Sequence, residues 1–128
     1  MTGFIDDIEK LTKENNNFRK VLFTGKYSQL VVMSLKPGED IGLETHDNVD
    51  QFFRVDEGKG EVIVDGQKSE IGDGFAVVVP AGSEHNIVNT GEVELKLYTI
   101  YSPANHSENT VHTSREEAMK AEEEHRSH

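Results

Sequence analysis

The segment Gly42–Gly66, GLETHDNVDQFFRVDEGKGEVIVDG, places polar side chains where a half-apolar β segment begins. Glu44, His46 and Gln51 fall within its first ten residues, ahead of a strand pattern and three further glycines. Side chains two residues apart on a strand share a face, so Glu44 and His46 are expected to point the same way. A turn between ETH and QFF would bring Gln51 to them from an adjacent strand. A solvated loop would hold the same side chains without any further role, so the choice lies between a loop and a metal site.

Turn residues divide the chain on both sides of this segment into short apolar stretches. From about residue 19 to 101, strand-like runs such as QLVVMSLKPG and FAVVVPAG end at Gly, Asp, Asn or Pro at nearly every junction. Asp65-Gly66 is a strong hairpin signal. In VELKLYT, apolar residues alternate with charged ones, as in a strand with one buried face. About eight short strands at this spacing predict an all-β sandwich or barrel.

The two ends of the chain have helical patterns instead. Residues 4–14, FIDDIEKLTKE, form a short amphipathic pattern that NNN at 15–17 interrupts. SPANHSENTVHTS is expected to be an irregular connection, and Thr113 followed by Glu116 resembles a capping box that starts a C-terminal helix. We therefore divide the chain into an N-terminal helix and arm (1–18), a barrel (19–102), and a lid-like connection with an acidic helix (103–128).

A second polar position lies downstream, in Gly72–Asn89, GDGFAVVVPAGSEHNIVN. The chain is expected to turn at Pro80-Ala81-Gly82 and to reach His85 as another strand starts. With Glu44, His46 and Gln51, this gives a carboxylate, two imidazoles and an amide oxygen, which suit a divalent first-row metal and leave positions for water and substrate. The alternatives are a turn histidine at 85, an exposed charge at Glu44, and a Gln51 that only orients a ligand.

These segments resemble the paired signature motifs of the cupin superfamily. The second motif, Gly, five residues, Pro-x-Gly, two residues, His, three residues, Asn, is matched in full by Gly74, Pro80, Gly82, His85 and Asn89. The first motif is matched at Gly38, His46 and Gly58, with Glu44 in place of its first histidine and Gln51 in place of its glutamate. The resemblance covers about residues 30–101. It implies a double-stranded β-helix, the jelly-roll barrel, flanked here by a short N-terminal helix and a C-terminal helix.

The resemblance also implies one divalent transition metal, Zn, Mn, Fe or Ni, bound by Glu44, His46, Gln51 and His85. The variant ligand set is similar to that of the phosphomannose isomerase-like branch of cupins. Small cupins often close one mouth of the barrel with the segment after the last strand, so His106 or His112 is a candidate lid group or acid–base. The candidate catalytic residues are Glu44, as a proton acceptor, and His112.

The expected pocket argues against a sugar phosphate. With Gln51 facing inward, Phe53 and Val55 also face inward and Arg54 faces outward, while Phe75, Val77 and Val79 or their neighbours add apolar lining. No Lys or Arg stands where it would obviously hold a phosphate. The sequence therefore predicts a small, apolar-walled pocket for a neutral, aromatic or weakly chelating molecule.

Three functions remain open. The first is a metal-dependent isomerase, lyase or oxygenase that acts on a small organic molecule. The second is a non-catalytic module that binds or senses a small ligand in the same pocket. The third, a structural dimerising unit with a vestigial site, fits four retained polar positions least well.

Composition and charge exclude some classes of binding partner. The formal net charge of −11 argues against nucleic acid, because phosphate neutralisation needs a basic face. No apolar run approaches the roughly 20 residues that span a bilayer, and no signal pattern opens the chain, so neither a membrane partner nor export is expected. Without cysteine there is no disulfide or thiolate site, and a cytoplasmic location is the default. A homodimer is expected from the cupin resemblance, with Phe4, Ile5 and Ile8 as possible contact residues.

Overall fold

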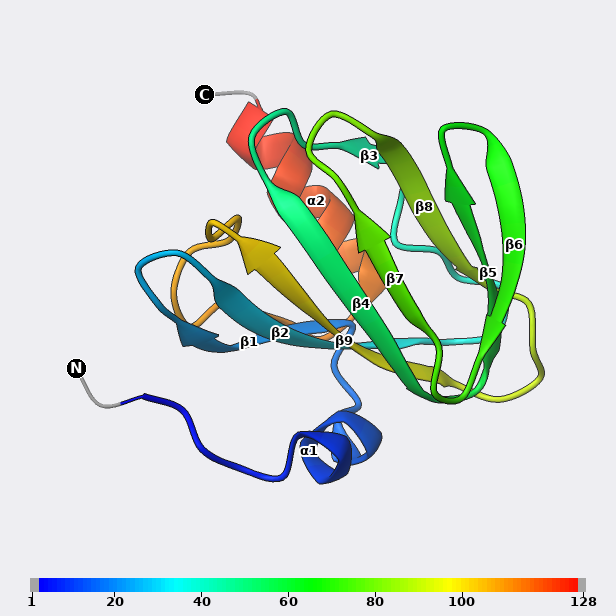
Figure 1. Ribbon diagram of the computed structural model, residues 1–128. Helices are drawn as coiled ribbons and strands as arrows, with labels where there is room; N and C mark the ends of the chain where they lie inside the picture. Colours follow the sequence, from blue (N-terminus) through cyan, green and yellow to red (C-terminus); the bar gives the residue numbers. More distant parts are fainter. Residues whose placement is uncertain (1–2, 127–128) are drawn as a thin grey trace.

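Two antiparallel sheets face each other and form a barrel (Figure 1). The computed structural model describes residues 3–126. Its strands are β1 (Arg19–Thr24), β2 (Gln29–Leu35), β3 (Glu44–Thr45), β4 (Asp50–Glu57), β5 (Lys59–Val64), β6 (Gln67–Gly72), β7 (Ala76–Val79), β8 (Glu84–Asn89), β9 (Leu95–Ser102) and β10 (Val111–His112). Within the described chain, one sheet has the order β10-β1-β2-β9-β4-β7 and the other β3-β8-β5-β6.

Strand periodicity decides which side chains enter the barrel. On β4, burial alternates residue by residue, so Gln51, Phe53 and Val55 face inward while Arg54 is only partly buried. On β9, Leu97, Thr99 and Tyr101 face the same interior. Residues from both sheets join in one buried apolar cluster, in which β4 and β9 contribute Phe53, Val55 and Leu97. The inward direction of Phe53 and Val55 is thus confirmed.

A short helix, α1 (Ile8–Glu14), precedes the barrel. It begins later than the predicted residue 4, because the Asp7 side chain accepts a hydrogen bond from the Lys10 backbone N–H and so caps the first turn. Buried Lys96 on β9 donates to the Asn15 carbonyl and, at 3.1 Å, to Asn16 Oδ1, both just after the helix. This polar anchor fixes the end of α1 against the six-stranded sheet.

The segment after β9 is more regular than predicted, because Val111 and His112 form β10 and pair with Lys20 and Arg19 of β1. The second helix, α2 (Arg115–Arg126), follows at the opposite end of the molecule from α1 (Figure 1). Its N-terminal cap is formed by Ser114 and Glu117, one residue later than the predicted pair Thr113 and Glu116.

At this cap, the Glu117 N–H donates to Ser114 Oγ at 3.1 Å, and the Glu117 carboxylate accepts from Thr113. Helix α2 is anchored to the barrel at two points. The Arg115 guanidinium lies 2.7 Å from the Asp40 carboxylate, and the backbone of Asp40 forms an isolated β-bridge with Val88 of β8. Ala118 of the helix is buried in the core.

The predicted all-β barrel with one helix at each end is confirmed. Residues 1–2 and 127–128, the outermost parts of the predicted N-terminal arm and C-terminal helix, lie outside the described residues. Across the described part of the chain, neither helix has the length and apolar character that a bilayer crossing requires.

Candidate metal centre

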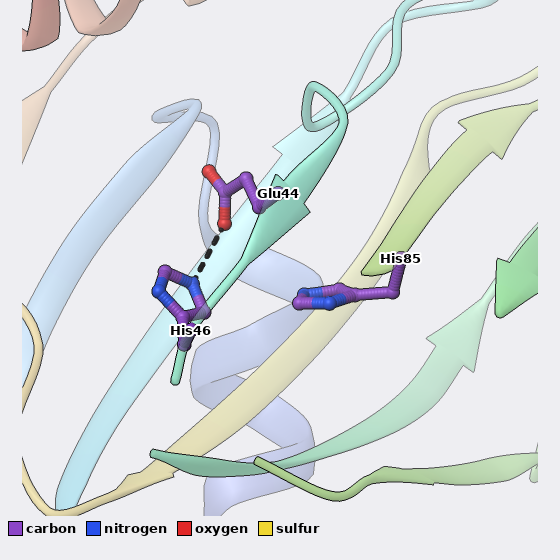
Figure 2. A group of neighbouring side chains, drawn as sticks. All are labelled: Glu44, His46 and His85. Carbon is purple, nitrogen blue, oxygen red and sulfur yellow. Dashed lines mark hydrogen bonds and ion pairs between the residues drawn. The ribbon is translucent and has the colours of Figure 1, made fainter. Parts of the chain in front are cut away.

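Glu44 opens the short strand β3, and His46 directly follows it. Strand β3 pairs with the start of β8, so that Glu44 stands opposite His85. The Gly82 N–H donates to the His46 carbonyl at 2.8 Å and ties the turn before β8 to this strand. Glu44 Oε2 lies 3.0 Å from His46 Nε2, so the two side chains share a face as predicted (Figure 2).

His85 points toward this pair from the neighbouring strand β8 of the same sheet (Figure 2). Its side chain is 1% exposed. Nδ1 lies 3.2 Å from the Ser83 carbonyl and Nε2 lies 3.1 Å from Gln51 Oε1. Burial is the main cause that lowers the pKa of His85, which favours the neutral ring.

Gln51 completes the group from the other sheet. Its amide Nε2 donates to Thr99 Oγ1 at 3.0 Å, which turns Oε1 toward His85. A neutral imidazole has one N–H, yet both ring nitrogens of His85 face oxygen acceptors. When Nδ1–H donates to Ser83, a nitrogen lone pair and a carbonyl oxygen lone pair meet at 3.1 Å, an arrangement that a cation would stabilise.

The donor set fits a divalent metal. One donor atom from each of Glu44, His46 and His85 lies within 4.8 Å of the others. One carboxylate, two imidazoles and an amide oxygen are suitable ligands for first-row divalent ions. The structure thus brings together the four side chains of the predicted ligand set.

A cavity of about 530 Å³ opens beside this group. It is lined by Leu43, Glu44, Thr45, His46, Asn105, His106, Ser107, Thr110, His112, Ala121 and Glu122. The expectation of an apolar wall is wrong for this part of the site, since most of these side chains are polar. Phe75 is also misplaced by the prediction: it precedes β7 and is 51% exposed, whereas Val79 is buried.

His106 lies in the returning segment 103–110, over the buried phenol of Tyr101. The two rings are 5.2 Å apart edge to face, and His106 Nε2 lies 3.3 Å from the Tyr101 hydroxyl. Burial, and then the nearby Arg19 charge, lower the pKa of His106 to about 3. Burial raises the pKa of Tyr101. Both groups are therefore neutral near pH 7.

His112, on β10, also lines the cavity. Its Nδ1 lies 3.4 Å from Arg19 Nη1. Because arginine only donates, Nδ1 is the acceptor and a neutral His112 has its hydrogen on Nε2. Burial and then the Arg19 charge lower the pKa of His112.

Sequence reasoning missed two buried polar side chains next to the cavity, Arg19 and Gln29. Arg19 is 1% exposed and lies 3.5 Å from Glu122 of α2, which places a buried cation behind the cavity that the sequence did not predict. Gln29, at the start of β2, bonds the backbone of Asn105 and His106 and holds the returning segment. For Arg19, the available signal was its alternation with Val21 on one face of the first strand.

Comparisons with known proteins agree with this architecture. The family described as "Cupin domain" matches residues 31–101. The uncharacterized protein YrkC of Bacillus subtilis (strain 168) is 48% identical over 126 residues, which cover 94% of this chain and 68% of YrkC. The uncharacterized protein L612 of Acanthamoeba polyphaga mimivirus is 39% identical over 80% of this chain and 67% of its own length.

A solved structure is also closely similar. The crystal structure of BH2720 from Bacillus halodurans has a TM-score of 0.91 and 44% sequence identity, and the match covers 93% of this chain and 95% of that one. The chain belongs to the cupin family.

Proposed function

We propose that this cupin binds one divalent transition metal through Glu44, His46, Gln51 and His85 and acts on a small organic molecule in the adjoining cavity. The observation that carries the proposal is the convergence of three donor side chains within 4.8 Å, with Gln51 Oε1 3.1 Å from His85 Nε2. A cluster of neutral and anionic donors at the end of a cavity is the usual design of a metal-dependent site. Bound there, the metal would polarise a substrate oxygen as a Lewis acid.

The chain's own residues supply the remaining roles. Glu44 is the proton acceptor in this proposal, since its carboxylate lines the cavity. His112 is the second candidate catalytic residue, and as a neutral ring it offers Nε2–H as a hydrogen-bond donor. The returning segment contributes Asn105, His106 and Ser107 to the wall of the cavity. Isomerase, lyase and oxygenase reactions are all compatible with these roles, and zinc, manganese, iron and nickel are the candidate metals.

The test begins with protein purified without added metal. Elemental analysis is expected to give about one equivalent of a transition metal, and His85→Ala is expected to lose it. Glu84→Ala is the matched control, because Glu84 is the neighbouring residue on β8 and is exposed. A panel of small organic substrates then separates enzyme from binder: turnover that His85→Ala abolishes and Glu84→Ala retains supports catalysis. Turnover equal in both variants contradicts a reaction at this site.

A further inference from the structure

Arg19 is a buried cation with one donor, Nε, that has no hydrogen-bond partner among the described residues. Its side chain is 1% exposed on the inward face of β1. Nη1 has a long contact of 3.4 Å with His112 Nδ1, and the Glu122 carboxylate is 3.5 Å away. A guanidinium has five N–H donors, and leaving donors of a buried charge unpaired costs free energy.

The position of Arg19 links this cation to the candidate metal centre. Both groups near its guanidinium, His112 and Glu122, line the cavity that also contains Glu44 and His46. Its charge reaches the same cavity, since it contributes to the lowered pKa of His106 and of His112. Arg19 itself is not among the described residues that line the cavity, so an anion would reach the guanidinium by displacing Glu122.

The charges of the cavity favour a monoanion. At one end, a divalent cation held there would, together with the Glu44 carboxylate, leave one positive charge. At the other end, Arg19 and Glu122 cancel. A ligand with one negative charge neutralises the whole site and provides the acceptor atoms that the guanidinium lacks.

We propose that the ligand of this cavity is a small organic carboxylate, whose carboxylate group pairs with Arg19 while Glu122 gives way. Its other polar end then lies toward Glu44, His46 and His85. The placement of the ligand's other end near the metal rests on the proposed function. The pairing of its carboxylate with Arg19 does not. The planar fork of a guanidinium matches a carboxylate. A phosphate would be expected to recruit further cations, and no lysine is among the described residues that line the cavity.

The test follows the Arg19 Nε–H signal by ¹H–¹⁵N NMR, in Zn²⁺-loaded and in metal-free protein. The probes are acetate and acetamide, which match in size and differ in charge. Acetate is expected to shift this signal saturably in both forms, and acetamide is expected to leave it in place. The signal is assigned through its own side-chain carbons, so no Arg19 variant needs to fold.

Glu122→Gln provides the second arm, because it removes the competing carboxylate and retains Arg19. It is expected to tighten acetate binding about two- to fivefold, the size of a partly exposed ion pair. Glu116→Gln is the matched control, since it changes charge equally on an exposed position of α2 and is expected to leave acetate affinity unchanged.

Three results overturn the proposal: equal effects of acetate and acetamide, unchanged acetate affinity in Glu122→Gln, or inorganic phosphate that binds more tightly than acetate. If the protein binds zinc but acetate has no effect on the Arg19 signal, this inference is wrong and the proposed metal function stands. An acetate effect at Arg19 in protein that does not bind zinc supports this inference and defeats the proposed metal function.

Discussion

Gln51 Oε1 and His85 Nε2 lie 3.1 Å apart across the two sheets of the barrel, and the amide is held in this orientation by Thr99. If this oxygen is a ligand, Gln51→Met retains most of the side-chain volume and removes the donor atom. We expect metal affinity to fall by more than the about 10- to 100-fold that is typical when a group that only orients a ligand is lost, as measured by competition with a chelator. Thr99→Val removes only the group that orients the amide and should weaken binding less. Equal affinity in Gln51→Met and the parent protein would exclude Gln51 from the ligand set.

The Gln29 side chain supports the cavity from a distance. Its Nε2 donates to the His106 carbonyl at 2.7 Å and to Thr24 Oγ1 at 2.9 Å, while Oε1 accepts from Asn105 and His106 N–H. Gln29→Leu should lower the free energy of unfolding by about 2–4 kcal/mol, because buried polar groups lose their partners. Hydrogen exchange at Asn105 and His106 should accelerate. Gln67→Leu, at an exposed position, is the control. If both amides still exchange slowly in Gln29→Leu, the returning segment is stable without the Gln29 side chain and the prediction is wrong.

Acid should destabilise the metal-free protein before its carboxylates titrate. The pKa values of His85, His106 and His112 are lowered in the fold, that of His106 to about 3. Between the unfolded histidine value near 6.5 and the folded value, the unfolded chain binds more protons, so stability falls as pH decreases. One buried histidine contributes at most about 1.4 kcal/mol per pH unit. In urea unfolding between pH 6.5 and 5, His106→Gln should flatten this slope, and an unchanged slope would contradict a neutral buried His106.

Gly58 and Gly74 of the two sequence motifs differ in what surrounds them. Both have positive φ, +103° and +85°. A Cβ at Gly58 would lie 2.8 Å from the Glu94 carbonyl oxygen, whereas a Cβ at Gly74 would meet nothing within 4 Å. Gly74→Ala should therefore cost about 1–2 kcal/mol for backbone strain alone. Gly58→Ala should cost about 1–3 kcal/mol more, because the strand must move. Equal losses in urea unfolding would mean that the close approach to Glu94 is easily relieved.

Local periodicity was enough to predict that Glu44 and His46 share a face, but Gln51 reaches them from the other sheet and not, as predicted, from an adjacent strand. Glu44 and His46 share a face because side chains on a strand alternate, and the turn at Pro80–Gly82 brings His85 opposite Glu44. The same alternation predicted Phe53 and Val55 correctly. It misled at Phe75, because this residue precedes β7 and does not follow the alternation of that strand.

Long-range pairing explains the remaining errors. Nothing in the two residues of β10 indicates a strand, and only their pairing with Arg19 and Lys20 makes them one. This pairing brings His112 to Arg19, and α2 then adds Glu122. The buried cation of the cavity thus depends on contacts between residues about 100 positions apart, which local patterns do not contain.

The most direct measurement is anomalous diffraction from crystals grown with Zn²⁺, recorded on both sides of the zinc absorption edge. We predict a single strong peak among Glu44, His46, Gln51 and His85, with donor atoms at about 2.0–2.2 Å from the ion. A structure in which these side chains surround no anomalous peak, or in which two of them turn apart toward solvent, would contradict the assignment of a metal centre.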